Sequence, residues 1–309
     1  MNAVRDDLEL SPVRQLAERR LGPVLPYLLH LRPAQWPIMT AHTCLGWWLA
    51  SGVQRLDGAA WLGLGAWVIA LNGGTLALNS AFDHDTGDIA FLRRPPPPPG
   101  ALGWFALALM VFGLGLTWAL PMGFRIVYAI CLVMSILYSV PPVRLKAVAG
   151  ADWVINMLGF GTFSPYAGWL ITGQSIDLRH HLIFWAFCPL FGALYPLTQL
   201  YQVDEDRARG DRTFAIRIGA RGSLAVAIAC AAMAFTLLAV AGEMSGWAGV
   251  RGGVRWLGLL VAAIAWCSVL LPWYRNARRW STREHQSGMY HALWAWGLTD
   301  VAVLLAWAV

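Results

Sequence analysis

AWLGLGAWVIALNGGTLALNSAFDHDTGD, residues 60–88, joins a long apolar run to a cluster of polar side chains. Its apolar part, residues 60–82, is long enough for a transmembrane helix, which needs about 20 mostly apolar residues. Acidic and amide groups beside a membrane segment are costly and usually mark a site. Four of them stand at or beyond the end of this run: Asn79, Asp83, Asp85 and Asp88. The stretch therefore predicts a membrane helix that ends in a functional site.

The rest of the chain is equally apolar. Of its 309 residues, 58% are hydrophobic and 13% are charged, and the mean hydropathy is +0.52. Nine apolar runs predict an all-α, multi-pass membrane protein, and their number and length exclude a large soluble all-α protein. The runs cover residues 33–50, 60–82, 101–120, 126–138, 153–171, 182–201, 224–241, 256–273 and 289–309.

The polar interruptions between these runs are too short to separate independent domains, so we expect one membrane domain over residues 33–309. Residues 1–32 form a polar, arginine-containing tail. The tail has no continuous apolar core and no cleavage site, so we expect no signal peptide. Its stretch from Leu8 to Leu25 is a candidate for an amphipathic helix on the membrane surface. The five cysteines are scattered singly and fit no metal-binding spacing.

A second polar cluster follows the run at 182–201 and contains Gln202, Asp204 and Asp206, with Arg207 beside them. Carboxylate and amide oxygens are ligands that Mg²⁺ prefers. On a helix, Asn79 and Asp83 of the first cluster share a face, because they are four residues apart. Two such clusters with arginines nearby suit divalent cations and a phosphorylated ligand. The alternatives are a solvated acidic loop for the first cluster and a charged helix cap for the second.

A third segment, Tyr138-Ser-Val-Pro-Pro-Val-Arg144-Leu-Lys146, carries the only lysine of a chain with 22 arginines. Arg144 and Lys146 are candidates for binding phosphate oxygens. The alternative is that they anchor the chain on the cytoplasmic side of the membrane. Arg94 precedes the run Pro95–Pro99, which cannot be helical and is placed to hold this arginine near the first cluster.

In their order and spacing, these three segments resemble the UbiA superfamily of intramembrane prenyltransferases, as a divergent member. The resemblance covers nearly the whole chain and includes the string from Val203 to Thr213, with Asp204, Asp206 and Gly210. It implies a bundle of nine transmembrane helices around a lipid-accessible cavity. The chain departs from the family pattern at two ligand positions, because Gly87 and Gln202 stand where a carboxylate is common. Arg94 and the prolines also replace a short turn of the family.

The resemblance implies Mg²⁺-dependent transfer of a polyprenyl group from an isoprenoid diphosphate to a membrane-soluble acceptor, an aromatic compound or a quinone or pigment precursor. The expected metal ligands are Asn79, Asp83, Asp85, Asp88, Gln202, Asp204 and Asp206. The expected diphosphate-binding residues are Arg94, Arg144, Lys146 and Arg207. The expected catalytic residues are Asp83, Asp206, Arg144, Lys146 and Tyr138.

Two other functions stay open at this point. A terpene cyclase would ionise the same donor without a second substrate, and a transporter of cations or lipids would use the acids as a cation site. The expected partners are the donor, a lipophilic acceptor and membrane lipid. The net charge of +6 comes mainly from loops on one side, so nucleic acid is not expected.

The basic residues predict the orientation of the chain in the membrane. If the nine runs all cross and the N-terminus is cytoplasmic, 18 of the 23 arginine and lysine residues face the cytoplasm and five face the other side. We therefore expect a protein of the cell (inner) membrane whose C-terminus lies on the opposite side.

Reporter fusions test this topology. Fusions made after Asp88 and after Asp211 are both expected to report a cytoplasmic position, because each follows an even-numbered run. A fusion after Val309 serves as the control and is expected to report the opposite side. If the first two fusions report opposite sides, the two acidic clusters cannot form one site.

Overall fold

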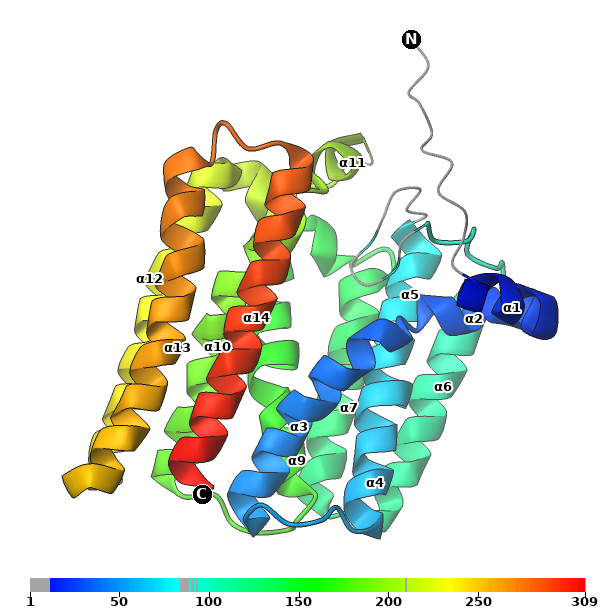
Figure 1. Cartoon of the computed structure of the whole chain (residues 1–309). Helices are drawn as coiled ribbons and strands as arrows, with labels where there is room; N and C mark the ends of the chain where they lie inside the picture. Colours follow the sequence, from blue (N-terminus) through cyan, green and yellow to red (C-terminus); the bar gives the residue numbers. More distant parts are fainter. Residues whose placement is uncertain (1–11, 84–88, 90–91, 93, 209, 309) are drawn as a thin grey trace.

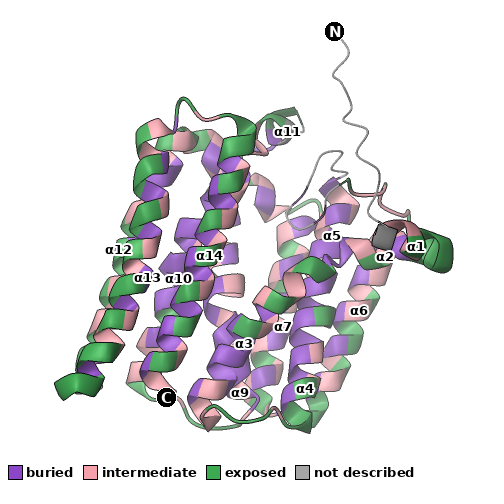
Figure 2. Cartoon of the chain, in the orientation of Figure 1, coloured by how far each residue is buried: buried purple, intermediate pink, exposed green. Residues whose placement is uncertain are grey.

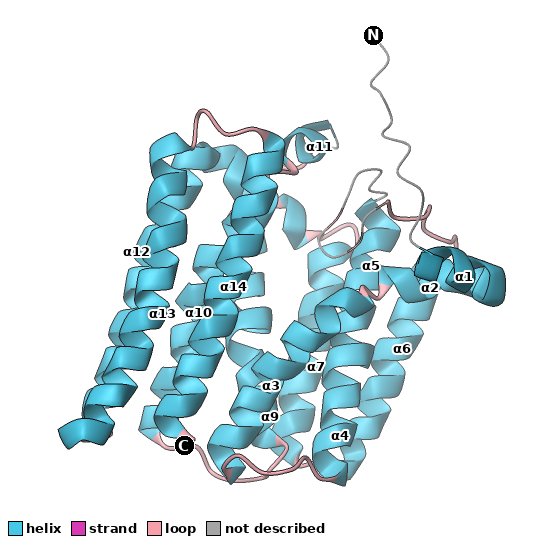
Figure 3. Ribbon diagram, viewed as in Figure 1, coloured by secondary structure: helices cyan, strands magenta, loops and turns pink. Residues whose placement is uncertain are grey.

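In a computed structural model of the protein, residues 12–83, 89, 92, 94–208 and 210–308 are described. These residues contain helices and no β-strand, which confirms the all-α prediction (Figure 3). Seven segments are long and apolar enough to cross a membrane. They are Gly58–Asp83, Leu102–Ala119, Met122–Ser139, Leu178–Gln199, Phe214–Met244, Gly249–Asn276 and Thr282–Trp307.

The first of these segments is continuous through α4 (Gly58–Leu64), the π-helical stretch η3 (Gly65–Gly73) and α5 (Gly74–Asp83). The others are α6 (Leu102–Leu116) with its final turn, α7 (Met122–Ser139), α10 (Leu178–Gln199), α12 (Phe214–Met244), α13 (Gly249–Asn276) and α14 (Thr282–Trp307). Each of the seven coincides with one of the nine predicted runs.

The two remaining predicted runs, 33–50 and 153–171, are also helical but are not among the seven. The first is α3 (Trp36–Ser51), which at 16 residues is shorter than the usual span. The second is a composite of α8 (Ala151–Asn156), the π-helical stretch η6 (Met157–Phe163) and α9 (Ser164–Leu170). Both lie among the long helices of the bundle (Figure 1).

Several helices begin earlier than the apolar runs predict. The helix α7 begins at Met122, although Arg125 interrupts the apolar pattern. The Arg125 guanidinium lies 4.0 Å from the centre of the Trp118 ring, so the charge stays at the end of the helix. The helix α12 begins at Phe214 and passes a kink at Gly219, whose φ of 71° favours glycine.

The buried apolar side chains form two clusters. One is built mainly from α10, α12, α13 and α14, and the other mainly from α3, η3, α5, α6 and α7. Residues of α3 and α9 belong to both clusters, because these helices lie between the two groups (Figure 1). Exposed residues lie along the outward faces of the helices (Figure 2). They include large apolar side chains such as Trp104 and Phe112, as expected for a protein surrounded by lipid.

Glycines bring α3 and α9 into backbone contact. A Cβ atom at Gly46 would overlap the carbonyl oxygen of Pro165, and one at Gly168 would overlap the carbonyl oxygen of Thr43. Small residues that allow such an approach are typical of helix pairs in membranes, where packing rather than hydrophobic exclusion holds helices together. These two glycines therefore allow α3 and α9 to pack closely at the centre of the bundle.

A buried polar pair connects α3 with α14. His42 Nδ1 lies 2.9 Å from Asp300 Oδ1, and His42 Nε2 lies 3.1 Å from the carbonyl oxygen of Gly161 in η6. The imidazole ring is enclosed by Phe187 and Trp296, with ring centres 4.7 and 4.8 Å away. Because both ring nitrogens have partners, the histidine is held in place without an exposed polar atom.

The N-terminal helices α1 (Pro12–Leu21) and α2 (Leu25–His30) lie at the end of the bundle where α5 ends (Figure 1). Arg14 Nη2 donates a hydrogen bond to the Arg94 carbonyl oxygen at 2.9 Å, and His30 Nε2 lies 3.0 Å from the Pro96 oxygen. Within the described residues, the proline run forms no helix, as its sequence requires. The position of α1 on a membrane surface stays a prediction.

Candidate diphosphate and metal site

A cavity of about 230 Å³ lies inside the bundle and reaches the ends of α5 and α10. Its lining is polar at that end, with Asn79, Asp83, Lys146 and Asp206. The lining also includes apolar and aromatic side chains of η3, α7, η6 and α10: Trp67, Leu71, Met134, Phe160, Phe191 and Leu194. The cavity therefore offers a charged end and a hydrocarbon-like interior to one ligand.

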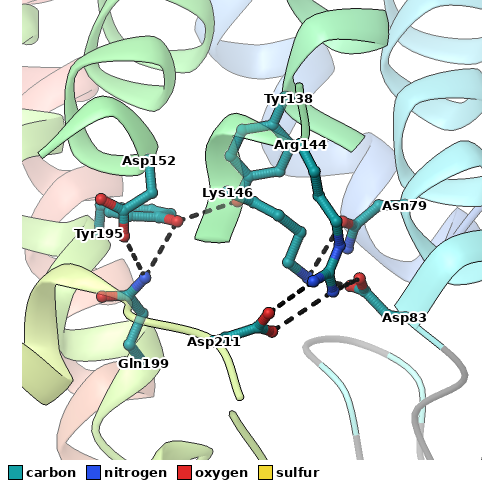
Figure 4. Close-up of polar contacts among 9 residues, drawn as sticks. All are labelled: Asn79, Asp83, Tyr138, Arg144, Lys146, Asp152, Tyr195, Gln199 and Asp211. Carbon is teal, nitrogen blue, oxygen red and sulfur yellow. Dashed lines mark hydrogen bonds and ion pairs between the residues drawn. The ribbon is translucent and has the colours of Figure 1, made fainter. Parts of the chain in front are cut away.

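The first acidic cluster meets the single lysine of the chain. Asn79 and Asp83 lie one turn apart at the end of α5, and Asp83 is 3% exposed. Lys146, in the short turn η5 (Leu145–Ala147) after α7, places its Nζ 3.4 Å from Asn79 Oδ1 and in an ion pair with Asp83 Oδ2 (Figure 4). The two oxygens predicted to bind a metal thus converge on one cationic group.

Arg144 connects the first cluster to the loop that follows the second. Its Nη1 donates to Asp211 Oδ1 at 2.6 Å, and its Nη2 donates to Asp83 Oδ1 at 3.3 Å (Figure 4). Burial disfavours the charged guanidinium, but the hydrogen bonds and negative charges of Asp211 and Asp83 outweigh it. The net effect raises the pKa of Arg144. The residue adopts a φ of 38°, a conformation that non-glycine residues rarely take unless the surroundings impose it.

The second cluster places one carboxylate in the cavity. Asp206, in the short helix α11 (Val203–Ala208), is 5% exposed and lines the cavity with Gln202. The backbone N–H of Asp211 donates to the carbonyl oxygen of Asp206 at 3.0 Å. This bond connects Asp211, whose carboxylate binds Arg144, to the turn that carries Asp206.

A buried network supports this end of the cavity from behind. Asp152, which is fully buried, accepts hydrogen bonds from the backbone N–H of Gly150 at 2.8 Å and of Phe214 at 3.0 Å. It also accepts one from Gln199 Nε2 at 2.8 Å (Figure 4). These three donors satisfy the buried carboxylate of Asp152. They also tie the start of α12 to the loop that carries Arg144 and Lys146.

Two tyrosines continue the network to the cavity. Gln199 Nε2 lies 3.1 Å from the Tyr195 hydroxyl, which lies 2.9 Å from the Tyr138 hydroxyl (Figure 4). Both tyrosines line the cavity. Their rings are therefore held in a fixed orientation next to the polar end.

The structure brings together most, but not all, of the residues predicted from sequence. Six of them line the cavity: Asn79, Asp83, Tyr138, Lys146, Gln202 and Asp206. Arg144 contacts this group through Asp83. Asp85 and Asp88 lie outside the described residues.

Besides Arg144, three predicted residues do not line the cavity. Asp204 has a 92% exposed side chain, which pairs with Arg207 Nη1 at 3.7 Å, and Arg207 is itself 61% exposed. Arg94 is exposed as well. These three residues lie beside the acidic motifs in the sequence but outside the cavity in the structure.

Sequence reasoning missed Asp152, Gln199 and Asp211 as parts of the site. Asp211 belongs to the quoted second motif, so its carboxylate was visible in the sequence. Gln199 was also visible, as an amide in an apolar run. Their partners lie 47 to 67 residues away, which no local spacing indicates.

The residues present fit a Mg²⁺ ion. The polar end of the cavity holds the carboxylates of Asp83 and Asp206 and the side-chain amides of Asn79 and Gln202. Hard oxygen donors of this kind suit Mg²⁺, which also keeps several waters and binds substrate phosphates. Among the described residues, no group of three His, Cys, Asp or Glu side chains is arranged to hold a metal ion by itself. A cation that is completed by phosphate oxygens agrees with this arrangement.

Known proteins resemble the chain in sequence. The model of the UbiA prenyltransferase family matches residues 36–296. A digeranylgeranylglyceryl phosphate synthase of Methanoregula boonei is 33% identical over an alignment of 179 residues, and the alignment covers 54% of this chain and 61% of that relative. The chain thus matches about three fifths of the length of this relative.

Solved structures resemble the chain in fold. A UbiA homolog from Archaeoglobus fulgidus, bound to DMAPP and Mg²⁺, has a TM-score of 0.63 at 19% identity and covers 90% of this chain and 99% of its own. A structure of a digeranylgeranylglyceryl phosphate synthase has a TM-score of 0.66 at 14% identity, covering 92% and 98%. At these identities the likeness concerns the fold alone.

Proposed function

The chain belongs to the UbiA prenyltransferase family, and we propose that it transfers a polyprenyl group from an isoprenoid diphosphate to a membrane-soluble acceptor. One observation carries the proposal. A single cavity joins a buried group of carboxylates and basic side chains to an apolar, aromatic interior. A prenyl diphosphate has the same two parts, a highly charged head and a hydrocarbon tail.

At the polar end, Asn79, Asp83, Gln202 and Asp206 would hold Mg²⁺. When bound, the ion supplies positive charge that stabilises the departing diphosphate. Arg144 and Lys146 add charged donors to the same end, where burial strengthens their interaction with anions. Lys146 now contacts Asn79 and Asp83, and we propose that its ammonium group turns to the diphosphate once the metal occupies those oxygens.

In the interior, the cavity walls would hold the hydrocarbon tail and protect the reacting carbon. As the allylic C–O bond breaks, positive charge develops on that carbon. Tyr138 and Tyr195 line the cavity and their hydroxyls are hydrogen-bonded to each other, which supports a role of these two rings in stabilising this charge. The apolar lining keeps water away, which favours attack by the acceptor over hydrolysis.

The acceptor class is proposed to be a lipophilic molecule that reaches the cavity from the membrane. An aromatic compound and a quinone or pigment precursor are the first candidates, and a glyceryl phosphate lipid joins them because of the Methanoregula boonei relative. A terpene cyclase would release diphosphate without consuming an acceptor, and a transporter would not release diphosphate at all. Product analysis by mass spectrometry separates these three outcomes.

We also propose that α3 and the α8–α9 segment cross the membrane together with the seven segments named above, which gives nine spans. The support is their position among the long helices (Figure 1) and their place in both apolar clusters. With nine spans, the arginine distribution orients the cavity's polar end to the cytoplasm. The reporter fusions after Asp88 and Asp211 test this orientation.

Metal dependence is the first test of the proposal. Chelation is expected to abolish release of diphosphate from geranylgeranyl diphosphate, and Mg²⁺ is expected to restore it. Asp83→Ala and Asp206→Ala should each reduce turnover by about a hundredfold or more. Each variant removes a group that stabilises the transition state, and a loss of about 2.7 kcal/mol of this stabilisation lowers the rate about a hundredfold. Asp204→Ala is the matched control, since its side chain is 92% exposed. Near-normal turnover in either buried variant would remove that residue from the site.

The basic loop gives a second test, measured as donor affinity. Arg144→Gln and Lys146→Gln are each expected to weaken binding of geranylgeranyl diphosphate about ten- to a hundredfold, because a charge-assisted hydrogen bond contributes about 1.5–3 kcal/mol. Acceptor affinity should stay the same. Lys146→Arg keeps the charge but changes the donor geometry, so partial loss is expected. Arg207→Gln, at a 61% exposed position, is the control. Unchanged donor affinity in both glutamine variants would mean that the loop serves only to anchor α7.

A further inference from the structure

Gln199 is a buried amide whose orientation is fixed by its partners. It lies at the end of α10 and is 6% exposed. The backbone N–H of Ala215 can only donate, and it donates to Oε1 at 3.1 Å. The other amide atom, Nε2, lies 2.8 Å from Asp152 Oδ2 and 3.1 Å from the Tyr195 hydroxyl. Because the amide nitrogen has donors only, Gln199 donates a hydrogen to the Tyr195 oxygen and accepts none from it.

The hydroxyls of Tyr138 and Tyr195 therefore hold one hydrogen more than their contacts use. Together they carry two hydrogens, and the 2.9 Å bond between them uses one, whichever residue donates. The Asn156 side chain also contacts Tyr138, in the sense that favours negative charge on the phenolic oxygen, which is that of a donor. Among the described residues, no other side chain accepts a hydrogen bond from either hydroxyl. One phenolic hydrogen, here called the spare hydrogen, is left for an occupant of the cavity.

The spare hydrogen lies at the polar end of the cavity. Both tyrosines line the cavity. Tyr138 is close enough to Asp83, and Tyr195 to Asp206, for the carboxylate charges to act on the two hydroxyls. In Figure 4 the two hydroxyls lie between the side chains of Gln199 and Asp83. Asp83 and Asp206 are the carboxylates proposed to hold Mg²⁺, so the spare hydrogen is near the proposed position of the diphosphate.

We propose that Gln199 is a positioning residue, which holds the tyrosine pair so that its spare hydrogen donates to an oxygen of the bound diphosphate. The inference rests on the proposed function in that the polar end binds this group. A hydroxyl that donates to a charged oxygen makes a strong hydrogen bond. Negative charge on the diphosphate grows as the allylic C–O bond breaks, so this bond becomes stronger in the transition state. Asp152 contributes by holding the same amide.

Inorganic diphosphate with Mg²⁺ tests the contact without any turnover. The full chain in lipid nanodiscs is titrated with this probe in a calorimeter. The double variant Tyr138→Phe/Tyr195→Phe keeps both rings but has no spare hydrogen, so it is expected to bind the probe about ten- to a hundredfold more weakly. Each single variant keeps one hydroxyl with its hydrogen, and a smaller loss is expected.

Tyr128→Phe is the matched control for the loss of a hydroxyl. The Tyr128 hydroxyl donates to the Met110 carbonyl oxygen at 2.9 Å, and Tyr128 is not among the described residues that line the cavity. Its replacement removes a buried hydrogen bond of the same kind from the same bundle. Affinity for inorganic diphosphate with Mg²⁺ is therefore expected to stay the same.

Gln199→Met tests the positioning role, because methionine has a similar length but no N–H donor. In the otherwise unchanged chain it is expected to weaken binding of inorganic diphosphate about three- to tenfold. In the double phenylalanine variant it should cause no further loss, since the amide acts through the hydroxyls. Equal losses in both backgrounds would show that Gln199 only supports the fold and would overturn the proposal. Normal affinity of the double phenylalanine variant would overturn it as well.

Release of diphosphate from saturating geranylgeranyl diphosphate is the second readout. The double phenylalanine variant should slow this release about a hundredfold, as expected for the loss of a donor to developing negative charge. Unchanged release would overturn the positioning role and leave the transferase intact. A wild-type protein that shows tyrosine-dependent binding of inorganic diphosphate but releases none from the donor would refute the transferase and keep the positioning role.

Discussion

The fold depends on the neutralisation of buried carboxylates by one short loop. Arg144 and Lys146 lie two residues apart, yet between them they contact Asn79 and Asp83 at the end of α5 and Asp211 before α12. Without these cations Asp83 and Asp211 would lose their ion pairs with the loop, and removing one partner of a buried ion pair costs about 3–5 kcal/mol. The loop is thus the point at which the two halves of the bundle are joined electrostatically, and it is also the candidate anion-binding surface.

Under the proposed function, the loop has two roles. Its ion pairs hold the acids in place before ligands bind, and we propose that the same cations bind the diphosphate when a metal ion is present. The contacts of Asp152 support this proposal, because they connect the loop to the start of α12 through Gln199 and the backbone N–H groups of Gly150 and Phe214. Movement of a side chain such as Lys146 then leaves the backbone of the site unchanged.

Much of the fold could be predicted from sequence because a membrane helix is a local feature, encoded in one continuous apolar run. Seven of the nine predicted runs coincide with segments long enough to span. The family assignment was confirmed for the same reason, since its motifs are short strings at the ends of such runs. Asn79 and Asp83 were correctly placed on one helical face because four residues make about one turn.

The rest could not be predicted because it depends on which loops and distant helices meet. Asp204 and Asp206 are equivalent in the sequence, but only the second faces the cavity, since the turn of α11 points the first to solvent. His42 and Asp300 are 258 residues apart, and no pattern connects them before the bundle forms.

The most direct measurement of the central claim is an experimental structure of the protein with Mn²⁺ in place of Mg²⁺ and with geranylgeranyl diphosphate. Anomalous scattering from Mn²⁺ locates the metal independently of its ligands. We expect oxygens of Asn79, Asp83 and Asp206 to bind the metal and the Lys146 ammonium group to have moved onto the diphosphate. A metal bound elsewhere, with Lys146 still paired to Asp83 and the diphosphate distant from Arg144, would contradict it.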